Sequence, residues 1–345
     1  MKSTPNFGIG EIEGPMHYLH GALPALCNRL DFSENDATRF TDGVLASAYA
    51  CPALLTDKAM LQGQVKSIPA ARSFWNLCGD MLLSNDSTLV GVEHLSRAFD
   101  HQRGGGNVVL VQNHRAGSDM LVMETLIRRH LGFDACDNWF YMAGHVINLY
   151  LIPLLWSAGL NRFQIFSVKY GTSAVDGMTE QSMTRQNIRA MRSLGIHADQ
   201  GGTLTVYYPE GGRGTGCMKK GEPKTSCIPR NIAGSDKPLL ILPTYVQGTE
   251  NLLPQDRGSH EFNSILNNIK SGTASCIIGE PIAWEALVEA NKSHEGDRPV
   301  WNQRICDTLL TLVAQLGPED EAGPYSMEHP EIGQLIKPFQ GGVLV

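Results

Sequence analysis

The sequence lacks the cysteine patterns of a zinc ribbon or a disulfide framework. None of its eight cysteines belongs to a CxxC pair, and they are spread along all 345 residues. Both kinds of structure need closely spaced cysteines, so we expect reduced thiols in a reducing compartment. His145, His197 and His260 also have no second histidine at a metal-ligand spacing, and no metal site is expected.

An excess of positive charge is missing as well. Lysine and arginine total 28 against 35 aspartates and glutamates, which gives a formal net charge of -7. Broad binding to nucleic acid or to an anionic membrane needs clustered lysine and arginine in excess. We therefore expect no nucleic-acid partner, whereas a local basic pocket and peripheral contact with a membrane both stay open.

The patterns of an export signal and of a membrane span are not found. Residues 1–20 contain no basic stretch followed by an apolar run. The longest apolar stretch, residues 146–160, is too short to cross about 30 Å of hydrocarbon and contains Pro153. It is interpreted as a buried helix or an interfacial patch, and the protein is expected to be soluble and cytoplasmic.

Hydrophobic residues make up 42% of the chain, and their pattern changes twice along it. In residues 1–85 the apolar spacing is helical, which predicts a helical N-terminal segment. In residues 86–317 short runs rich in valine and isoleucine alternate with amphipathic stretches, as in proteins built from strand-helix-strand units. Residues 318–345 form an acidic tail. The predicted fold is therefore α/β, with a mixed, mostly parallel sheet flanked by helices and preceded by a small helical domain.

Particular runs predict the elements of this fold. The predicted strands are Val108 to Gln112, Phe163 to Val168, Thr203 to Tyr208, Leu239 to Pro243 and Cys276 to Ile278. The predicted helices are Met120 to His130, Ile147 to Trp156, Thr184 to Leu194 and the amphipathic run at 301–316. The glycines at 104–106 precede a strand and are interpreted as a turn.

The first segment that carries chemistry is NVVLVQNHRAGSDM at 107–120. Its pattern is that of a strand followed by a break at Gly117 and Ser118. If Ser118 caps a helix that starts near Asp119, the carboxylate can fold back onto the ring of His114. An aspartate in that position fixes the histidine tautomer and leaves the other ring nitrogen to act as a general base.

The second segment is GGTLTVYYPEGGRGTG at 201–216. The His-x4-Asp spacing alone is weak, since the two side chains could equally serve a strand end and a helix start. Here a second strand ends in a glycine-rich turn that contains Glu210, Gly211, Gly212 and Arg213. Glycines let a backbone approach a ligand closely, and a guanidinium suits phosphate or carboxylate.

Both segments resemble sequence blocks of the glycerolipid acyltransferases. NHRAGSD is similar to the His-x4-Asp block of that family, and YPEGGRG is similar to its Glu-Gly-x-Arg block. AGLNRFQIFSVKYG, ILPTYV and GEPI resemble softer blocks of the family in the same order. The closest resemblance is to the soluble, plastid-type glycerol-3-phosphate 1-O-acyltransferases, which have two glycines before that arginine and a helical domain before the α/β domain.

The resemblance implies roles for particular residues. His114 is the expected general base, and Asp119 is expected to orient it. The residues expected to bind the acceptor are Glu210, Gly211, Gly212, Arg213, Lys169 and Tyr170.

The chain departs from the plastid-type pattern at two positions. That pattern has histidine where this chain has Tyr170, and a further arginine where it has Thr215. Losing one charge-assisted hydrogen bond to phosphate weakens binding by about tenfold or more. Lys219, Lys220 and Arg162 are further candidate ligands for a phosphate, and they could equally be solvated loop charges.

The implied reaction moves a fatty acyl group from acyl-CoA or acyl-carrier protein to a hydroxyl group. The favoured acceptor is the sn-1 hydroxyl of glycerol 3-phosphate, and no cofactor is expected besides the thioester co-substrate. The partners are thus a thioester donor and a small polar acceptor. An alternative is the same chemistry on a different alcohol or amine. A hydrolase would not need Arg213, and a non-catalytic acyl-carrier binding protein would not need His114 or Asp119.

Overall fold

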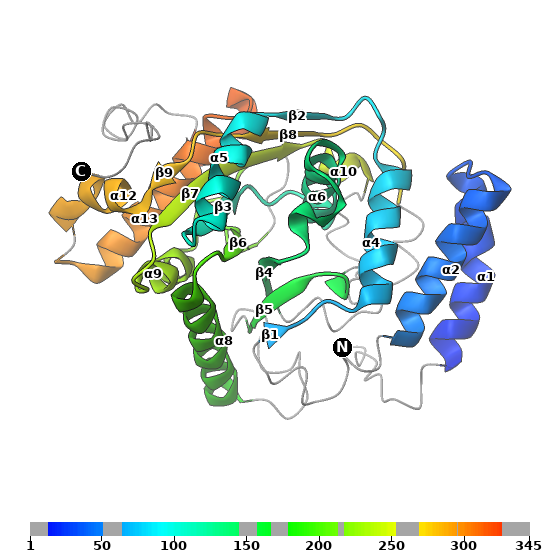
Figure 1. Ribbon diagram of the computed structural model, residues 1–345, viewed down its shortest axis with the longest axis horizontal. Helices are drawn as coiled ribbons and strands as arrows, with labels where there is room; N and C mark the ends of the chain where they lie inside the picture. The colour runs from blue at the N-terminus through cyan, green and yellow to red at the C-terminus, as the bar shows by residue number, and fades with distance from the viewer. Residues whose placement is uncertain are drawn as a thin grey trace.

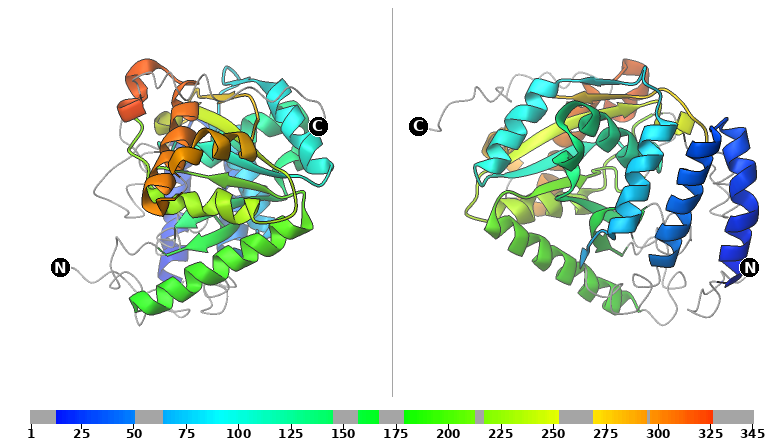
Figure 2. Two further views of the ribbon diagram at one scale, coloured as in Figure 1. Left: turned by 90° about the vertical axis from the view of Figure 1, so that its left-hand side faces the viewer. Right: turned by 45° about the vertical axis from the view of Figure 1, so that its right-hand side comes forward.

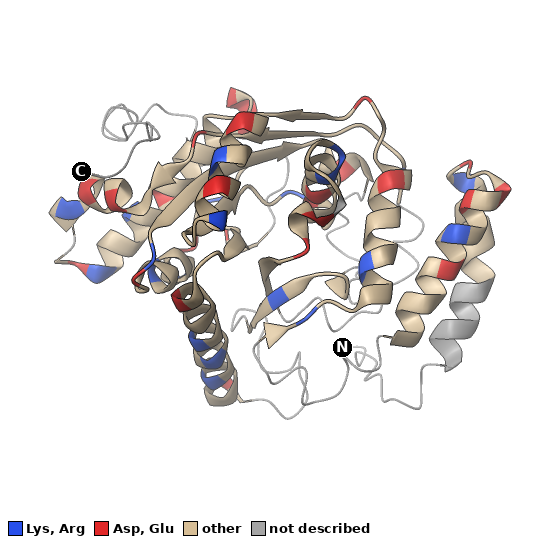
Figure 3. Ribbon diagram, viewed as in Figure 1, with Lys and Arg blue, Asp and Glu red and all other residues tan. Residues whose placement is uncertain are grey.

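The computed structural model describes residues 13–50, 64–144, 157–166, 179–212, 217–252, 269–294 and 296–325. Within these ranges the strands form one nine-stranded sheet with helices on both faces, and a helical region lies at one end (Figure 1). Charged residues lie mainly on helices and loops, and few interrupt the strands (Figure 3). Among the described residues, no helix combines the length and apolar character needed to cross a membrane.

The bounds of the elements are as follows. The strands are β1 (Gln64–Val65), β2 (Thr88–Val90), β3 (Asn107–Gln112), β4 (Trp139–Gly144), β5 (Asn161–Ile165), β6 (Leu204–Tyr207), β7 (Leu239–Gln247), β8 (Ser275–Ile278) and β9 (Ile282–Ala283). The α-helices are α1 (Glu13–Arg29), α2 (Glu34–Ala50), α4 (Pro69–Leu82), α5 (Val92–Arg103), α6 (Asp119–Leu131), α8 (Glu180–Gln200), α9 (Cys227–Ala233), α10 (Thr249–Leu252), α12 (Trp284–Ala290) and α13 (Arg298–Ala314).

The sheet is mixed and mostly parallel. Its strand order is β1-β5-β4-β6-β3-β7-β8-β2, and β9 pairs with β7. The run from β5 to β7 is parallel throughout, and β2 is parallel to β8. The antiparallel pairs are β1 with β5, β8 with β7 and β9 with β7. The sheet and the helical region before it confirm the predicted fold class.

Strand β3 lies inside the sheet and is covered by helices on both faces (Figure 2). Val108 and Leu110 belong to a core that includes α4, α5 and α6. Val109 and Val111 point the other way, into a core that includes α8, α9 and α13. Burial on both faces requires a continuous apolar run, which is why this strand is visible in the sequence.

Helix α1 packs against α2, α2 packs against α4, and α4 packs against α6 (Figure 1). Phe40 of α2 and Phe74 of α4 meet edge to face, with their ring centroids 5.6 Å apart. Strand β1 was not predicted, because two residues are too few to show an alternating pattern. It pairs with β5, so residues within the predicted helical segment also complete the sheet. The domain boundary at residue 85 stays a prediction.

The five predicted strands correspond to β3, β5, β6, β7 and β8, with differences at their ends. The prediction also missed the short strands β2 and β9, and it missed β4 although Trp139, Phe140 and Tyr141 are good strand formers. The predicted helices Met120 to His130, Thr184 to Leu194 and 301–316 correspond to α6, α8 and α13. The predicted helix from Ile147 to Trp156 lies outside the described residues.

The chain turns back over the sheet domain after α13. Residues 318–325 contain two short 3-10 helices, η9 (Glu319–Glu321) and η10 (Gly323–Tyr325). Tyr325 is buried among residues of the core that includes α13. This first part of the predicted acidic tail therefore packs against the domain, and residues 326–345 lie outside the described residues.

A buried carboxylate ties α4 to α6 and β4. Glu124 of α6 is fully buried, and its Oε2 accepts hydrogen bonds from Arg72 Nη1 at 2.6 Å and Trp75 Nε1 at 2.9 Å. Tyr141 of β4 donates its hydroxyl to Oε1. Burial raises the pKa of Glu124, while Arg72 and the two other donors lower it. The helical region is thus fastened to the sheet domain by polar contacts as well as by apolar packing.

We expect Glu124→Ala to lower the free energy of unfolding by about 3 kcal/mol, because three buried donors lose their acceptor. Urea unfolding followed by circular dichroism measures this change. The control is Glu285→Ala, an exposed glutamate of α12 that should change stability by less than about 0.5 kcal/mol. Equal effects of the two substitutions would contradict the role given to Glu124.

Candidate active site

Three neighbouring strands of the sheet end at the same edge and bring polar side chains together. The order β6-β3-β7 is parallel, so the carboxyl ends of these strands are adjacent. His114 follows β3, Glu210 follows β6 and Thr249 follows β7. Crevices at the carboxyl ends of parallel strands are the usual ligand sites of α/β proteins.

Asn113 fixes the point where the chain leaves β3. Its Nδ2 donates to the carbonyl oxygen of Val246 at 2.9 Å, and its Oδ1 accepts from the Val246 N–H at 2.8 Å. The side-chain amide thereby replaces one peptide unit of the ladder between β3 and β7. Sequence reasoning missed Asn113, although an amide directly after a buried strand is a signal for such a contact.

The imidazole of His114 and the carboxylate of Asp119 form a hydrogen-bonded pair. Nδ1 of His114 lies 2.8 Å from Oδ2 of Asp119. The side chain of Asp119 is 1% exposed and that of His114 is 20% exposed. An ionised carboxylate only accepts hydrogen bonds, so Nδ1 is the donor of this pair, and in the neutral imidazole Nε2 then keeps its lone pair. Among the described residues, none forms a hydrogen bond with Nε2.

The carboxylate of Asp119 is held from three further directions. Its Oδ2 also accepts the N–H of Arg115 at 2.7 Å, and its Oδ1 accepts the N–H of Ala116 at 2.9 Å. The hydroxyl of Thr249 donates to Oδ1 at 2.6 Å. These contacts orient the carboxylate toward His114 before any ligand binds.

The predicted capping role of Ser118 is wrong. Ser118 occupies the N-cap position of α6, but it makes no side-chain cap and its φ and ψ of −88° and −3° are helical. A capping serine needs an extended backbone to turn its hydroxyl toward the helix. The hydroxyl instead donates to the carbonyl oxygen of Thr249 at 2.6 Å and ties the start of α6 to α10.

The ring of Tyr208 covers one face of the His114 imidazole. The two rings are stacked with centroids 4.3 Å apart and planes inclined by 29°. Burial raises the pKa of Tyr208 well above its usual value, and the carboxylates of Asp119 and Glu124 add to this effect. Tyr208 therefore stays neutral and restricts the rotation of His114. Sequence reasoning did not select it, although it stands at the end of the strand before the glycine-rich turn.

Glu210 joins the two sequence blocks, which lie 96 positions apart. Its Oε1 accepts the backbone N–H of His114 at 3.1 Å, and its Oε2 accepts the N–H of Lys219 at 3.2 Å. Burial raises the pKa of Glu210 to about 7, although the two backbone N–H groups lower it. Glu210 thus fixes the position of the histidine backbone relative to the glycine-rich turn.

The turn after Glu210 depends on glycine at one position. Gly211 has a φ of +61°, and a Cβ there would lie only 2.8 Å from Cβ of Glu222. Both the conformation and the close approach exclude a larger residue. At Gly212 a Cβ would lie 3.6 Å from Nζ of Lys219, so the ammonium group of Lys219 is next to this turn.

Three residues predicted to bind an acceptor, Lys169, Tyr170 and Arg213, lie outside the described residues. The candidate ligand Arg162 is buried near the amino end of β5, at the opposite edge of the sheet from His114. Its Nη1 donates to Oγ of Ser157 at 2.7 Å, so it is a structural residue and not a loop charge.

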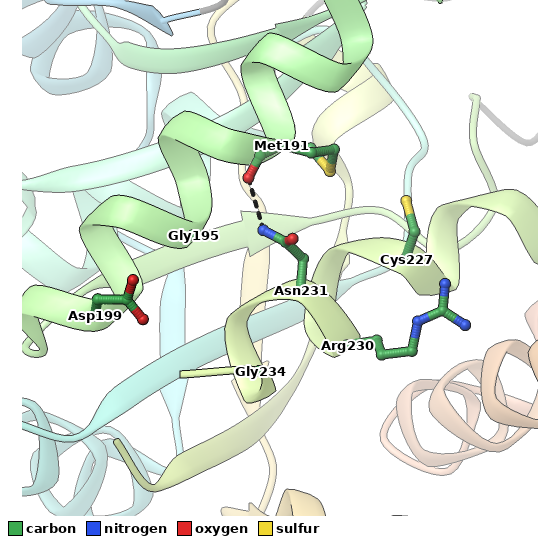
Figure 4. Close-up of a pocket in the computed structure, with 7 residues that line it drawn as sticks. All are labelled: Met191, Gly195, Asp199, Cys227, Arg230, Asn231 and Gly234. Atoms are coloured by element: carbon green, nitrogen blue, oxygen red, sulfur yellow. Dashed lines mark hydrogen bonds between the residues drawn. The ribbon is translucent and has the colours of Figure 1, made fainter. Parts of the chain in front are cut away.

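A groove between α8 and α9 lies away from these residues (Figure 4). Asn231 of α9 donates to the carbonyl oxygen of Met191 of α8 at 2.7 Å and closes part of it. The groove contains none of the residues selected from the sequence. The candidate site is therefore the cluster around His114 at the carboxyl ends of the strands.

No protein-family model matches the sequence, and comparison with curated proteins gives no match either.

We expect the stability of the protein to fall as the pH rises through the pKa of Glu210. Because the folded-state pKa is about 7 against an ordinary value of 4.5, the folded state holds this proton more tightly than the unfolded state. The stabilisation by this proton is complete below pH 4.5 and is lost above pH 7. The free energy of unfolding should fall by roughly 3 kcal/mol over this range. Urea unfolding at a series of pH values, compared between the wild type and Glu210→Gln, measures it.

The control for this experiment is Glu93→Gln, whose side chain is 72% exposed. Its pH profile should run parallel to that of the wild type. The profile of Glu210→Gln should be flatter between pH 4.5 and 7, and a profile parallel to the wild type would contradict the shifted pKa.

Proposed function

We propose that the protein is an acyltransferase that moves a fatty acyl group from a thioester to a hydroxyl acceptor. The observation that carries this proposal is the hydrogen-bonded pair of His114 and Asp119 at the end of β3, with Glu210 bound to the backbone of the same histidine. A histidine whose Nδ1 is bound to a carboxylate can use its Nε2 as a general base, which removes a proton from a bound hydroxyl group. The resemblance of both segments to the glycerolipid acyltransferases supports the same chemistry.

In the proposed reaction, Nε2 of His114 takes the proton of the acceptor hydroxyl. At the same time the hydroxyl oxygen attacks the carbonyl carbon of the thioester. Asp119 stabilises the imidazolium that forms and keeps the ring oriented. The tetrahedral intermediate then collapses, the bond from carbon to sulfur breaks, and the thiolate takes the proton back from His114. The acyl group ends on the acceptor oxygen, and no covalent acyl-enzyme is formed.

The proposed acceptor is glycerol 3-phosphate, acylated at its sn-1 hydroxyl group. The glycine-rich turn with Lys219 beside it supports an anionic acceptor, because an ammonium group attracts phosphate. Arg213, Lys169 and Tyr170 remain proposed ligands of that acceptor. Since Tyr170 and Thr215 depart from the plastid-type pattern, the alternative is a different alcohol or an amine with the same chemistry.

The proposed donor is acyl-CoA or acyl-carrier protein, with no other cofactor. The proposal places the protein in the cytoplasm and leaves peripheral contact with a membrane open. The chemistry at His114 is the same for both donors, so a comparison of the two thioesters with one acceptor distinguishes them.

We expect His114→Ala to lower the rate of acyl transfer by about 10²–10⁴, the usual contribution of a general base. Release of free thiol and the mass of the acylated product are measured with purified protein, a palmitoyl thioester and glycerol 3-phosphate. The control is His130→Ala, an exposed histidine in the last turn of α6, the helix that carries Asp119, and it should retain the wild-type rate. Full activity of His114→Ala would rule out the general-base role.

A panel of acceptors separates the competing functions. It contains glycerol 3-phosphate, glycerol, a long-chain alcohol and ethanolamine, each examined by mass spectrometry. An acylated product from only a non-phosphorylated acceptor would support the alternative acceptor. Thiol release at the same rate without any acceptor would identify a hydrolase and overturn the proposal.

A further inference from the structure

The side chain of Arg115 extends away from the dyad and joins three segments of the chain. Its Nη2 lies 3.0 Å from Oε1 of Glu250 in α10, and its Nη1 lies 3.2 Å from the hydroxyl of Tyr245 in β7. Nη1 also donates to Oε2 of Glu321 in η9. The hydroxyl of Tyr245 donates to the same oxygen of Glu321. Arg115 and Glu321 are only 10% and 18% exposed, so they form a partly buried charge pair.

Glu321 also holds the segment that follows the glycine-rich turn. Its carbonyl oxygen accepts the N–H of Met218 at 2.8 Å. Nearby, the hydroxyl of Tyr325 accepts the N–H of Gly221 at 2.9 Å. At Gly323 a Cβ would lie 2.3 Å from the carbonyl oxygen of Met218, so the two segments are in close contact. Residues 319–325 thus lie against residues 218–221.

These contacts form a closed circuit around the dyad. The side chain of Glu321 holds Arg115, whose backbone N–H donates to Asp119. The main chain of Glu321 holds Met218, and the next residue, Lys219, donates its N–H to Glu210. Glu210 accepts the N–H of His114, which completes the circuit.

We propose that Glu321 is a positioning residue, which sets the loop of His114 and Asp119 relative to the glycine-rich turn. It acts through Arg115 on one side and through Met218 on the other, and it forms no hydrogen bond with the side chains of His114 and Asp119. The effect on rate rests on the proposed acyltransferase function, whereas the effect on the geometry of His114 does not.

The circuit depends on the charge of Glu321 and on its shape. One carboxylate oxygen accepts from both Arg115 and Tyr245, and charge-assisted hydrogen bonds of this kind are about twice as strong as neutral ones. Burial raises the pKa of Tyr245, with a further contribution from Glu321, so its hydroxyl stays protonated and donates. An amide at position 321 would keep the size of the side chain and lose the charge.

The first test is spectroscopic and needs no substrate. Protein labelled with ¹⁵N in its histidines is examined by NMR for the Nδ1–H proton of His114, which is assigned by its loss in His114→Gln. Glu321→Gln should shift or broaden this resonance, because Arg115 then holds Asp119 less rigidly. Asp320→Asn, which changes an exposed neighbour in the same turn, should leave it in place. Identical spectra for the two variants would overturn the proposal.

The second test separates positioning from stability. At a temperature well below its Tm, Glu321→Gln should lower kcat roughly 10–100-fold, the effect of a small displacement of a reacting group, with a KM for the thioester close to that of the wild type. Tyr245→Phe removes one donor to Glu321, and it should shift the Nδ1–H resonance in the same direction as Glu321→Gln but by a smaller amount. If Glu321→Gln does not fold, the spectrum of Tyr245→Phe decides whether Glu321 is a positioning residue. A lower Tm with unchanged kcat would show a structural role only and overturn the proposal. Wild-type protein without transfer activity would refute the proposed function, while the spectra would still decide the role of Glu321.

Discussion

Asp119 carries a fully buried carboxylate, and a buried charge without partners would cost many kcal/mol. Its four donors come from two segments: the loop after β3 supplies the ring of His114 and the N–H groups of Arg115 and Ala116, and α10 supplies the hydroxyl of Thr249. The carboxylate also lies at the start of α6, where the helix dipole favours negative charge. The loop, the helix and the end of β7 therefore adopt their relative positions around this one group. If it were removed, the loop and α10 would both lose their common partner at the start of α6.

The two carboxylates nearest to His114 have different surroundings and different tasks. Asp119 binds the ring and is surrounded by donors of several kinds. Glu210 binds the backbone of His114 and has two peptide N–H groups as its main partners. Two such donors do not offset its burial, and the pKa of Glu210 rises to about 7. One carboxylate thus sets the direction of the imidazole and the other sets its location.

The features that could be predicted from the sequence are those that depend on residues close together in the chain. β3 is visible as a continuous valine-rich run because helices cover both faces of the sheet, and the approach of His114 to Asp119 follows from a break after that strand. The predicted cap of α6 failed, because Ser118 found a partner 131 positions away that no local rule contains. Tyr208 and Glu321 were missed for the same reason, since stacking and ion pairs between distant segments leave no periodic trace. β1 was too short to leave one.

The side-chain amide of Asn113 has a consequence for the length of the loop. It pairs with the main chain of Val246 as a peptide unit would, so Asn113 is fixed to β7 although its own main chain lies beyond the end of β3. One added residue between this anchor and His114 would lengthen the chain there by up to about 3.3 Å and move the imidazole away from its contacts with Asp119 and Glu210. The distance from this anchor to His114 is therefore set by the pairing of Asn113 with β7.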